Sequence, residues 1–197
     1  MSSGIEKAWE LLSSLRPEDI SKNAGVAYKD GEYTIRSLGF DFAINPSKRD
    51  IRPLSTEGEA FIKRFGYFFN HSVLWYLIVA KDIPLSGRLV KPQSLKGGHH
   101  FFMGAHELPL SALAAKYKND REGFLGKGKK LGGRVLSYGD ASFELYPMPR
   151  IPVTLILWLS DEEFPERADL LFDSTVEIHI PLDIIWSIAM LTLLSLI

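Results

Sequence analysis

The strongest indication of the fold class is the segment Val153-Thr154-Leu155-Ile156-Leu157-Trp158-Leu159. It is a nearly unbroken apolar run, and such runs are typical of a β-strand that is covered on both faces. Two more strands are predicted just before it, over residues 134–138 and 141–146, on either side of Gly139-Asp140. The last third of the chain is therefore predicted to contain a sheet.

More strands are predicted near the N-terminus. Residues 26–29 and 32–36 flank Asp30-Gly31, a dipeptide that favours two-residue hairpin turns because both turn positions need a positive φ. Residues 40–44 follow as a further strand, and Asn45-Pro46 ends it. Taken with the strands of the last third, they predict one antiparallel or mixed sheet of five to six strands.

Two long apolar helices are predicted to pack against this sheet. Thr56 and Glu59 have the spacing of a capping box, which predicts a helix over residues 57–81. A second helix is predicted from Pro181 to the end of the sequence, and residues 184–197 carry no charge. Fourteen helical residues rise only about 21 Å, which is less than a bilayer core requires. This helix is therefore predicted to be buried in the core.

Shorter helical segments complete the prediction, over residues 5–15, 108–117, 121–131 and 168–172. Asp120 is the expected cap of the helix over residues 121–131, and the internal glycines Gly126 and Gly128 count against that helix. No repeat or linker interrupts the pattern. The fold class is predicted to be α+β, with residues 1–197 forming a single domain.

Composition excludes several classes of protein. The chain has 197 residues, of which 46% are hydrophobic and 12% aromatic, with 23 basic and 24 acidic side chains. This balance predicts neither nucleic acid nor an anionic membrane as a partner. The chain contains no cysteine, which excludes disulfides, thiol catalysis and an iron–sulfur cluster held by its own residues. The N-terminus lacks the pattern of a signal peptide, so a cytoplasmic location is expected.

Charge is unevenly distributed along the chain. Residues 81–134 carry eleven basic and four acidic side chains, whereas residues 135–197 carry two basic and ten acidic ones. The two regions could neutralise each other in the fold. They could instead form two opposite faces, one of which would attract an anionic ligand or partner.

Histidines are the first candidates for chemistry. His99, His100 and His106 lie in a glycine-rich segment. If that segment is extended, His100 and His106 point to the same side, and if it is helical, His99 and His106 share a face. Either pair could bind a metal or ligate a tetrapyrrole, with Met103 as a softer ligand. The alternative is that they are structural, hydrogen-bonded histidines.

Acidic residues and one arginine are the other candidates. Asp161, Glu162 and Glu163 follow the apolar strand and could hold a divalent metal or perform acid–base chemistry. They could equally form the cap of a turn or helix. Arg150 is followed by Ile151-Pro152 and preceded by Pro149, so its backbone is stiff. Its guanidinium could bind a carboxylate or phosphate, or pair with an acidic residue.

Several motifs together are similar to those of a bacterial and archaeal family defined by a domain of unknown function. The stretches that carry this resemblance are Gly97-Gly98-x-x-Phe101, Ala105-His106-x-Leu108-Pro109, Leu131-Gly132-Gly133, Gly139-Asp140-Ala141, Pro149-Arg150-Ile151-Pro152, Trp158-x-x-Asp161-Glu162-Glu163-Phe164-Pro165 and Leu171-Phe172-Asp173-Ser174. The resemblance spans about residues 55–197 and implies a setting near cofactor metabolism in anaerobes. Some relatives carry a cysteine-rich segment like the iron–sulfur module of corrinoid proteins, which this chain lacks. The family implies no activity.

Three hypotheses of function remain open. The first is a ligand- or cofactor-binding domain, accessory to corrinoid or other tetrapyrrole proteins, in which His100, His106, Arg150 and the acidic cluster face one pocket. The second is an enzyme that uses the carboxylates of Asp161, Glu162 and Glu163, together with His106, around a divalent metal. The third is an interaction module that docks to a partner protein, and a homodimer also stays open. Whether the chain is an enzyme is left undecided.

Overall fold

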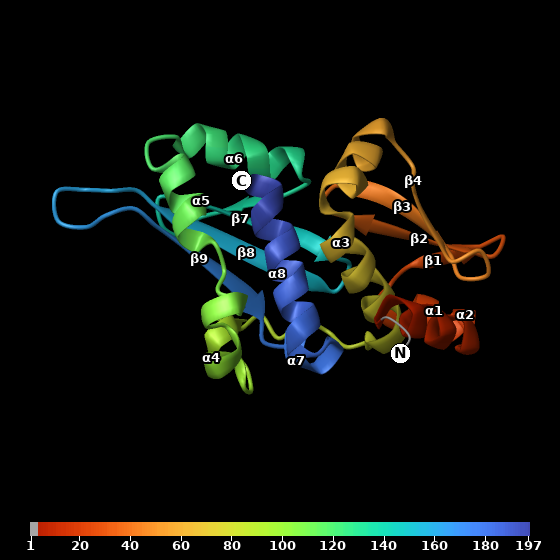
Figure 1. The fold of residues 1–197 in the computed structure, drawn as a ribbon. Coiled ribbons are helices and arrows are strands. Elements are labelled where there is room, and N and C mark those ends of the chain that lie inside the picture. Colours follow the sequence, from red (N-terminus) through yellow and green to blue (C-terminus); the bar gives the residue numbers. More distant parts are fainter. Residues whose placement is uncertain (1–3) are drawn as a thin grey trace.

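Each half of the chain forms an antiparallel meander that is packed against helices (Figure 1). The computed structural model describes residues 4–197. The first half comprises α1 (Gly4–Ser14), α2 (Pro17–Ala24), β1 (Ala27–Lys29), β2 (Glu32–Ser37), β3 (Phe40–Asn45), β4 (Asp50–Pro53) and α3 (Thr56–Val79). The second half comprises β5 (Leu89–Val90), η1 (Pro92–Ser94), α4 (Gly98–Phe101), η2 (Gly104–His106), α5 (Leu110–Tyr117), α6 (Arg121–Lys130), β6 (Arg134–Leu136), β7 (Ala141–Met148), β8 (Ile151–Trp158), β9 (Arg167–Asp173), α7 (Val176–His179) and α8 (Leu182–Leu196).

The α+β class is confirmed, and the strands divide between two sheets instead of forming the one predicted sheet. The first sheet has the order β1-β2-β3-β4 and the second the order β5-β9-β8-β7-β6. The two sheets meet where the turn between β2 and β3 reaches β7, and there the amide of Leu38 donates a hydrogen bond to the carbonyl of Tyr146 (3.0 Å). The sheets remain separate because a hairpin turn, and not a free strand edge, faces the second sheet.

The first hairpin and the long helix follow the sequence prediction closely. Asp30 and Gly31 both have a positive φ, as the predicted hairpin turn requires. The predicted helix over residues 57–81 is confirmed as α3, but its cap lies one residue earlier than the Thr56 pattern indicated. The backbone of Ser55 is extended, and its hydroxyl accepts a hydrogen bond from the amide of Gly58 (3.0 Å).

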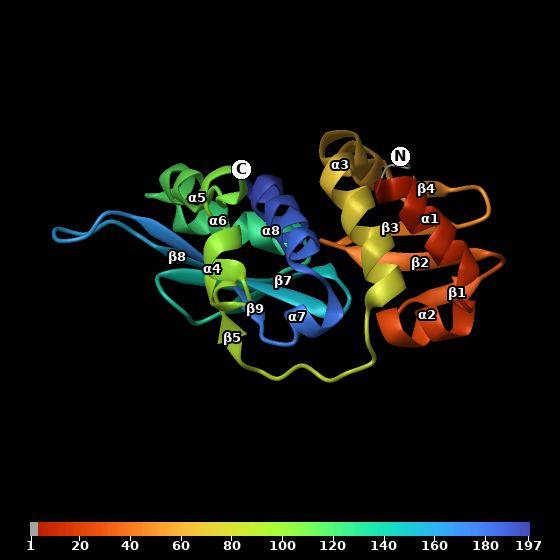
Figure 2. The same ribbon diagram turned by 60° about the horizontal axis from the view of Figure 1, so that its bottom comes forward.

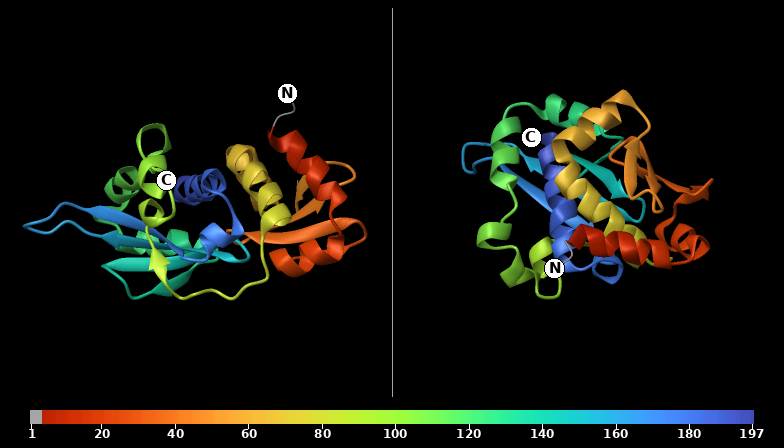
Figure 3. Two further views of the ribbon diagram at one scale, coloured as in Figure 1. Left: turned by 90° about the horizontal axis from the view of Figure 1, so that it is seen from below. Right: turned by 45° about the vertical axis from the view of Figure 1, so that its right-hand side comes forward.

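The apolar C-terminal helix is core, as predicted. It forms α8, whose residues are mostly buried, and it lies beside α3 at the junction of the two halves (Figures 1 and 3). In residues 4–197, no helix combines the length and apolar character that a membrane span needs. The helices α3 and α8 and the helices near them cover one side of the sheets, whereas the connector from α3 to β5 crosses the opposite side (Figures 2 and 3).

The prediction of a helical turn over residues 168–172 is wrong, because this segment lies within strand β9. Ala168, Leu170 and Phe172 are buried, and the residues between them are less so. This alternation has the period of a strand. Pairing with the fully buried strand β8 along its length overrides the local helical tendency.

Glycine inside α6 has a packing role that the sequence did not indicate. The helix predicted over residues 121–131 is confirmed, with the carboxylate of Asp120 accepting a hydrogen bond from the amide of Gly123 (2.8 Å). A Cβ atom at Gly128 would lie 2.5 Å from the ring of Phe143 on β7. Gly128 therefore lets α6 approach the second sheet closely enough to cover it.

A buried tyrosine ties the two halves together. The hydroxyl of Tyr76 on α3 donates a hydrogen bond to the carbonyl of Ala24 (2.6 Å) and accepts one from the amide of Arg150 (3.1 Å). Tyr76 is fully buried, and this burial raises the pKa of its phenol, so the hydroxyl keeps its proton. One hydroxyl thus joins the end of α2, the long helix α3 and the turn between β7 and β8.

We expect Tyr76→Phe to lower the free energy of unfolding by about 1–3 kcal/mol, because it leaves a buried carbonyl and a partly buried amide without a partner. Urea denaturation measures this loss. Tyr138→Phe is the matched control, since Tyr138 is exposed and should tolerate the change. Equal stability of the two variants would contradict the role given to Tyr76.

Candidate functional site

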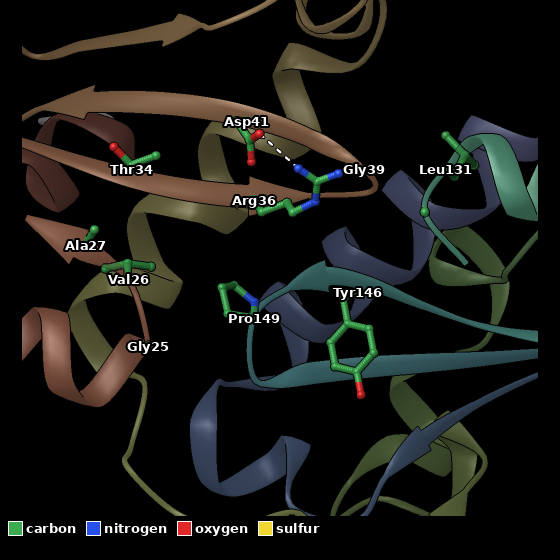
Figure 4. A pocket seen from close by; sticks show the side chains of 11 residues that line it. Gly25, Val26, Ala27, Thr34, Arg36, Gly39, Asp41, Leu131, Tyr146 and Pro149 are labelled. Carbon is green, nitrogen blue, oxygen red and sulfur yellow. Dashed lines mark hydrogen bonds and ion pairs between the residues drawn. The ribbon is translucent and has the colours of Figure 1, made fainter. Parts of the chain in front are cut away.

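A cavity lies at the junction of the two halves, and its volume is about 480 Å³. We call it the seam cavity (Figure 4). Its walls come from the α2–β1 junction, β2, the β2–β3 turn, β3, the α6–β6 loop and the end of β7. The lining residues are Gly25, Val26, Ala27, Thr34, Arg36, Gly39, Asp41, Leu131, Gly132, Tyr146 and Pro149.

A close approach of two glycines, Gly39 and Gly132, forms part of the wall of the seam cavity. Gly39 has φ +85° and Gly132 has φ +75°, both in the region that favours glycine. A Cβ atom on Gly39 would lie 3.0 Å from the carbonyl carbon of Leu131, and one on Gly132 would lie 3.1 Å from the Cα of Gly39. The α6–β6 loop therefore packs directly on the β2–β3 turn.

Three side chains of the first half, Arg36, Asp41 and Thr34, give the cavity its polar groups. The guanidinium of Arg36 and the carboxylate of Asp41 form an ion pair (2.9 Å) at its edge, and both groups are exposed to solvent. Thr34 is exposed next to them on β2. From the other half, Tyr146 contributes its aromatic ring, and its hydroxyl points away from Arg36 and Asp41 (Figure 4). Partial burial and the neighbouring carboxylate of Glu144 raise the pKa of this phenol.

Arg150 is placed beside the seam cavity but is engaged in structural bonds. Its guanidinium binds the carboxylate of Asp82 (2.6 Å) and the carbonyl of Lys22 (2.9 Å). Arg150 thus pairs with an acidic residue, which was one of the two alternatives that the sequence left open. Its partner Asp82 is not one of the acidic residues singled out in the sequence. Its buried Nε has no hydrogen-bond partner among the described residues.

The histidines lie elsewhere. His99 and His100 are on the short helix α4 and are exposed, and His106 belongs to the separate turn η2. The segment is therefore neither fully extended nor one continuous helix, so neither predicted pairing arises. His106 lines a hollow between α3 and α8 together with Trp186.

The acidic cluster lies in the long loop between β8 and β9, which projects from one end of the molecule (Figure 1). The carboxylate of Asp161 accepts hydrogen bonds from the amides of Glu163 (2.8 Å) and Phe164 (2.7 Å). These bonds lower the pKa of Asp161 and match the capping alternative. Within residues 4–197, no three His, Asp or Glu side chains are grouped so that they could hold a metal ion.

The structure therefore places the predicted site residues in three different parts of the fold. Arg150 is at the seam, His106 is beside α8, and Asp161, Glu162 and Glu163 are in the projecting loop. Sequence reasoning missed Arg36 and Tyr146. Nothing in their local sequence marks them, since they face one cavity only after the two halves have come together.

Some of the basic side chains of residues 81–134 form ion pairs with acidic side chains of residues 135–197. Lys91 pairs with Asp169 (2.8 Å) and Arg134 pairs with Glu144 (3.0 Å), which are contacts of the neutralising kind. Lys127 on α6 has no such ion pair with an acidic side chain among residues 4–197 and lies instead near other basic residues. Partial burial, followed by the charges of Lys116, Arg64 and Lys130, lowers its pKa. A cluster of positive charge thus lies over α3, α5 and α6.

A buried carboxylate fastens the connector between the halves. Asp173 at the end of β9 is only 4% exposed and accepts hydrogen bonds from the amide and hydroxyl of Ser86, the amide of Gly87, and the amide and hydroxyl of Thr175. Burial alone would raise its pKa, but the bonds from Thr175 and Ser86 outweigh burial and lower the pKa to about 2. Asp173 thus holds residues 86–87 against the second sheet.

Comparison with known proteins gives a family and no activity. The sequence profile of DUF3786, a domain of unknown function, matches residues 16–194. No curated protein and no solved structure matches the chain.

The depressed pKa of Asp173 makes stability depend on pH in a definite window. Its stabilisation is complete above the unfolded pKa of about 3.9 and is lost as pH falls towards the folded value of about 2. Asp173→Asn should lower the free energy of unfolding by about 2 kcal/mol at neutral pH, with the difference from wild type shrinking between pH 4 and pH 2. A difference that does not change with pH would contradict this origin.

Gly39→Ala tests the glycine contact of the seam cavity. Gly31→Ala is the control, because Gly31 also has a positive φ but a Cβ atom added to it would meet no other atom within 4 Å. The control should lower the free energy of unfolding by about 1 kcal/mol because of its positive φ alone. Gly39→Ala should lower it by about 1–3 kcal/mol more because the added methyl group overpacks the contact. Thermal denaturation compares the two variants, and equal losses would show that the contact is not tight.

Proposed function

The chain belongs to the DUF3786 family, and we propose that it is a binding domain that holds a small carboxylate-bearing molecule in the seam cavity. The observation that carries this proposal is that Arg36 and Tyr146, from different halves of the chain, line one cavity of about 480 Å³. That volume lies in the range of small-molecule sites, which often form where two structural units meet.

The ligand's acidic group is assigned by the chemistry of Arg36. A guanidinium has five N–H donors in a planar fork that matches a carboxylate. Arg36 uses one of its terminal nitrogens for Asp41, so further donors remain for a ligand. An exposed ion pair contributes only about 0–1 kcal/mol, and a small rearrangement of Arg36 towards a ligand therefore costs little.

The ligand's body is assigned by the rest of the lining. Val26, Ala27, Leu131 and Pro149 present apolar surface, and Tyr146 adds an aromatic ring. Apolar walls with a few placed polar groups are typical of sites that recognise a small organic molecule. The lining supplies groups for binding, and we assign no reaction to it.

A tetrapyrrole or corrinoid is the finer form of this proposal. The carboxylate arms of a tetrapyrrole or the amide arms of a corrinoid would bind at Arg36, with a role accessory to corrinoid or tetrapyrrole proteins. Support for that setting comes from the sequence resemblance alone. His100 and His106 are not among the residues that line the seam cavity, so this form of the proposal assigns them no axial ligation.

A second function is favoured by the charge around Lys127. Like charges on Arg64, Lys116 and Lys130 surround this partly buried lysine and lower its pKa, an arrangement that an acidic partner would relieve. On this alternative the domain is an interaction module that docks to an acidic protein surface. A salt-sensitive self-association in sedimentation experiments would indicate that the partner is a second copy.

The test of the seam cavity is a titration with benzoate, followed by amide NMR signals, and with haemin and hydroxocobalamin, followed by visible absorbance. We expect benzoate to shift the signals of Gly39 and Tyr146, and Arg36→Gln to weaken binding roughly tenfold or more without changing the melting temperature.

The control for this titration is Arg16→Gln, which also breaks an exposed ion pair, with Asp19, away from the cavity. It should leave binding unchanged. If none of the three probes binds the wild type at the seam, or if Arg36→Gln binds as tightly as Arg16→Gln, the proposal fails.

A further inference from the structure

A second, smaller hollow of about 180 Å³ lies between α3 and α8 and is independent of the seam cavity. We call it the aromatic hollow. Its lining residues are Tyr67, His71, Phe101, His106, Asp183, Trp186 and Ser187, none of which lines the seam cavity. Its lining residues come from α3, from α8 and from the segment that comprises α4 and η2.

Aromatic rings set at right angles form the walls of the aromatic hollow. His106 stacks on Phe101, with ring centroids 4.4 Å apart and planes 12° apart. Trp186 stands at 85° to His106, with centroids 5.2 Å apart, and is backed by Phe68 at 71°. Tyr67 is 77% exposed at the edge. The arrangement is a box with two perpendicular walls and an exposed ring at its edge, which contacts Phe68 edge to face (5.2 Å between ring centroids).

The charge of the aromatic hollow is negative. Asp183 is exposed in the first turn of α8 and forms no ion pair or hydrogen bond through its side chain with any residue among 4–197. No lysine or arginine is among the lining residues. The face of each aromatic ring also carries partial negative charge. A carboxylate beside aromatic walls attracts a cation.

The side chains that line the hollow decide which kind of cation would fit there. His71, His106 and Asp183 all line the hollow, yet they are not grouped closely enough to hold a metal ion. A primary ammonium would need acceptors for three N–H groups, and the walls are mainly aromatic. A fully methylated ammonium needs no acceptor and is bound by ring faces through cation–π attraction.

We propose that the aromatic hollow is a cage for the quaternary ammonium group of a small organic cation. Trp186, His106 and Tyr67 would surround the methyl groups, and Asp183 would balance the charge from the open side. The cage lies apart from the seam cavity, so the proposal does not depend on the carboxylate site.

The experiment compares choline with 3,3-dimethyl-1-butanol, in which a neutral carbon replaces the charged nitrogen. Binding is followed through the indole N–H signal of Trp186, which has no hydrogen-bond partner in the described part of the chain. We expect choline to shift this signal in a saturable way and the neutral alcohol to bind at least roughly fivefold more weakly. Equal binding of the two would show an apolar hollow and overturn the proposal, as would no shift with choline at high millimolar concentration.

Variants locate the site. Asp183→Asn should weaken choline binding severalfold with little change in melting temperature, because Asp183 is exposed. Glu162→Gln is its control, since it removes one negative charge from the distant β8–β9 loop and should leave binding unchanged. Tyr67→Ala removes an exposed ring without disturbing the core and should also weaken binding.

Equal affinity in Asp183→Asn, Tyr67→Ala and the control would overturn the cage. Zn²⁺ could instead shift the NMR signals of His71 and His106, with choline unable to compete. That result would assign the hollow to a metal and would also overturn the cage proposal. Benzoate binding at Arg36 is measured separately, so the failure of either site is distinguishable from that of the other.

Discussion

The hydroxyl of Tyr76 is the interaction on which the arrangement of the two halves depends. Each half has its own meander and its own helices, and local pairing explains both. They are fixed relative to each other by the packing of α8 against α3 and by a buried phenol that bonds to the carbonyl of Ala24 and the amide of Arg150 together. Buried backbone groups without hydrogen-bond partners lower the stability of a fold. The side chain of Tyr76 therefore helps to hold α2, α3 and the β7–β8 turn in fixed positions relative to one another.

The seam cavity is a consequence of that constraint. With the halves fixed through Tyr76 and through the bond from Leu38 to Tyr146, the β2–β3 turn must fit against the α6–β6 loop. Leu38 accepts a positive φ that a leucine disfavours, and Gly39 and Gly132 come into backbone contact. The space left below this contact is lined by both halves, so a ligand there would touch both.

Periodicity and turn chemistry were sufficient to predict most elements, because strands such as β8 and helices such as α8 are decided by their own residues. Ala168 to Phe172 was mispredicted because its strand character comes from pairing with β8. The separation into two sheets depends on which edges meet, and no single segment encodes that. The residues of the candidate site were the hardest to predict for the same reason: Arg36 and Tyr146 are far apart in sequence and line one cavity only when the two halves meet.

The polar residues that stand out in the sequence are largely used to hold the fold. Arg150 binds Asp82 and Lys22, Asp161 caps its own loop, and Asp173 fastens the connector. A polar group whose bonding capacity is filled by the protein has little left for a ligand. Groups that retain capacity, such as the remaining donors of Arg36 and the carboxylate of Asp183, are the ones that can bind. In this fold, unfilled hydrogen-bonding or charge capacity next to a hollow is a better guide to a binding site than the identity of the residue.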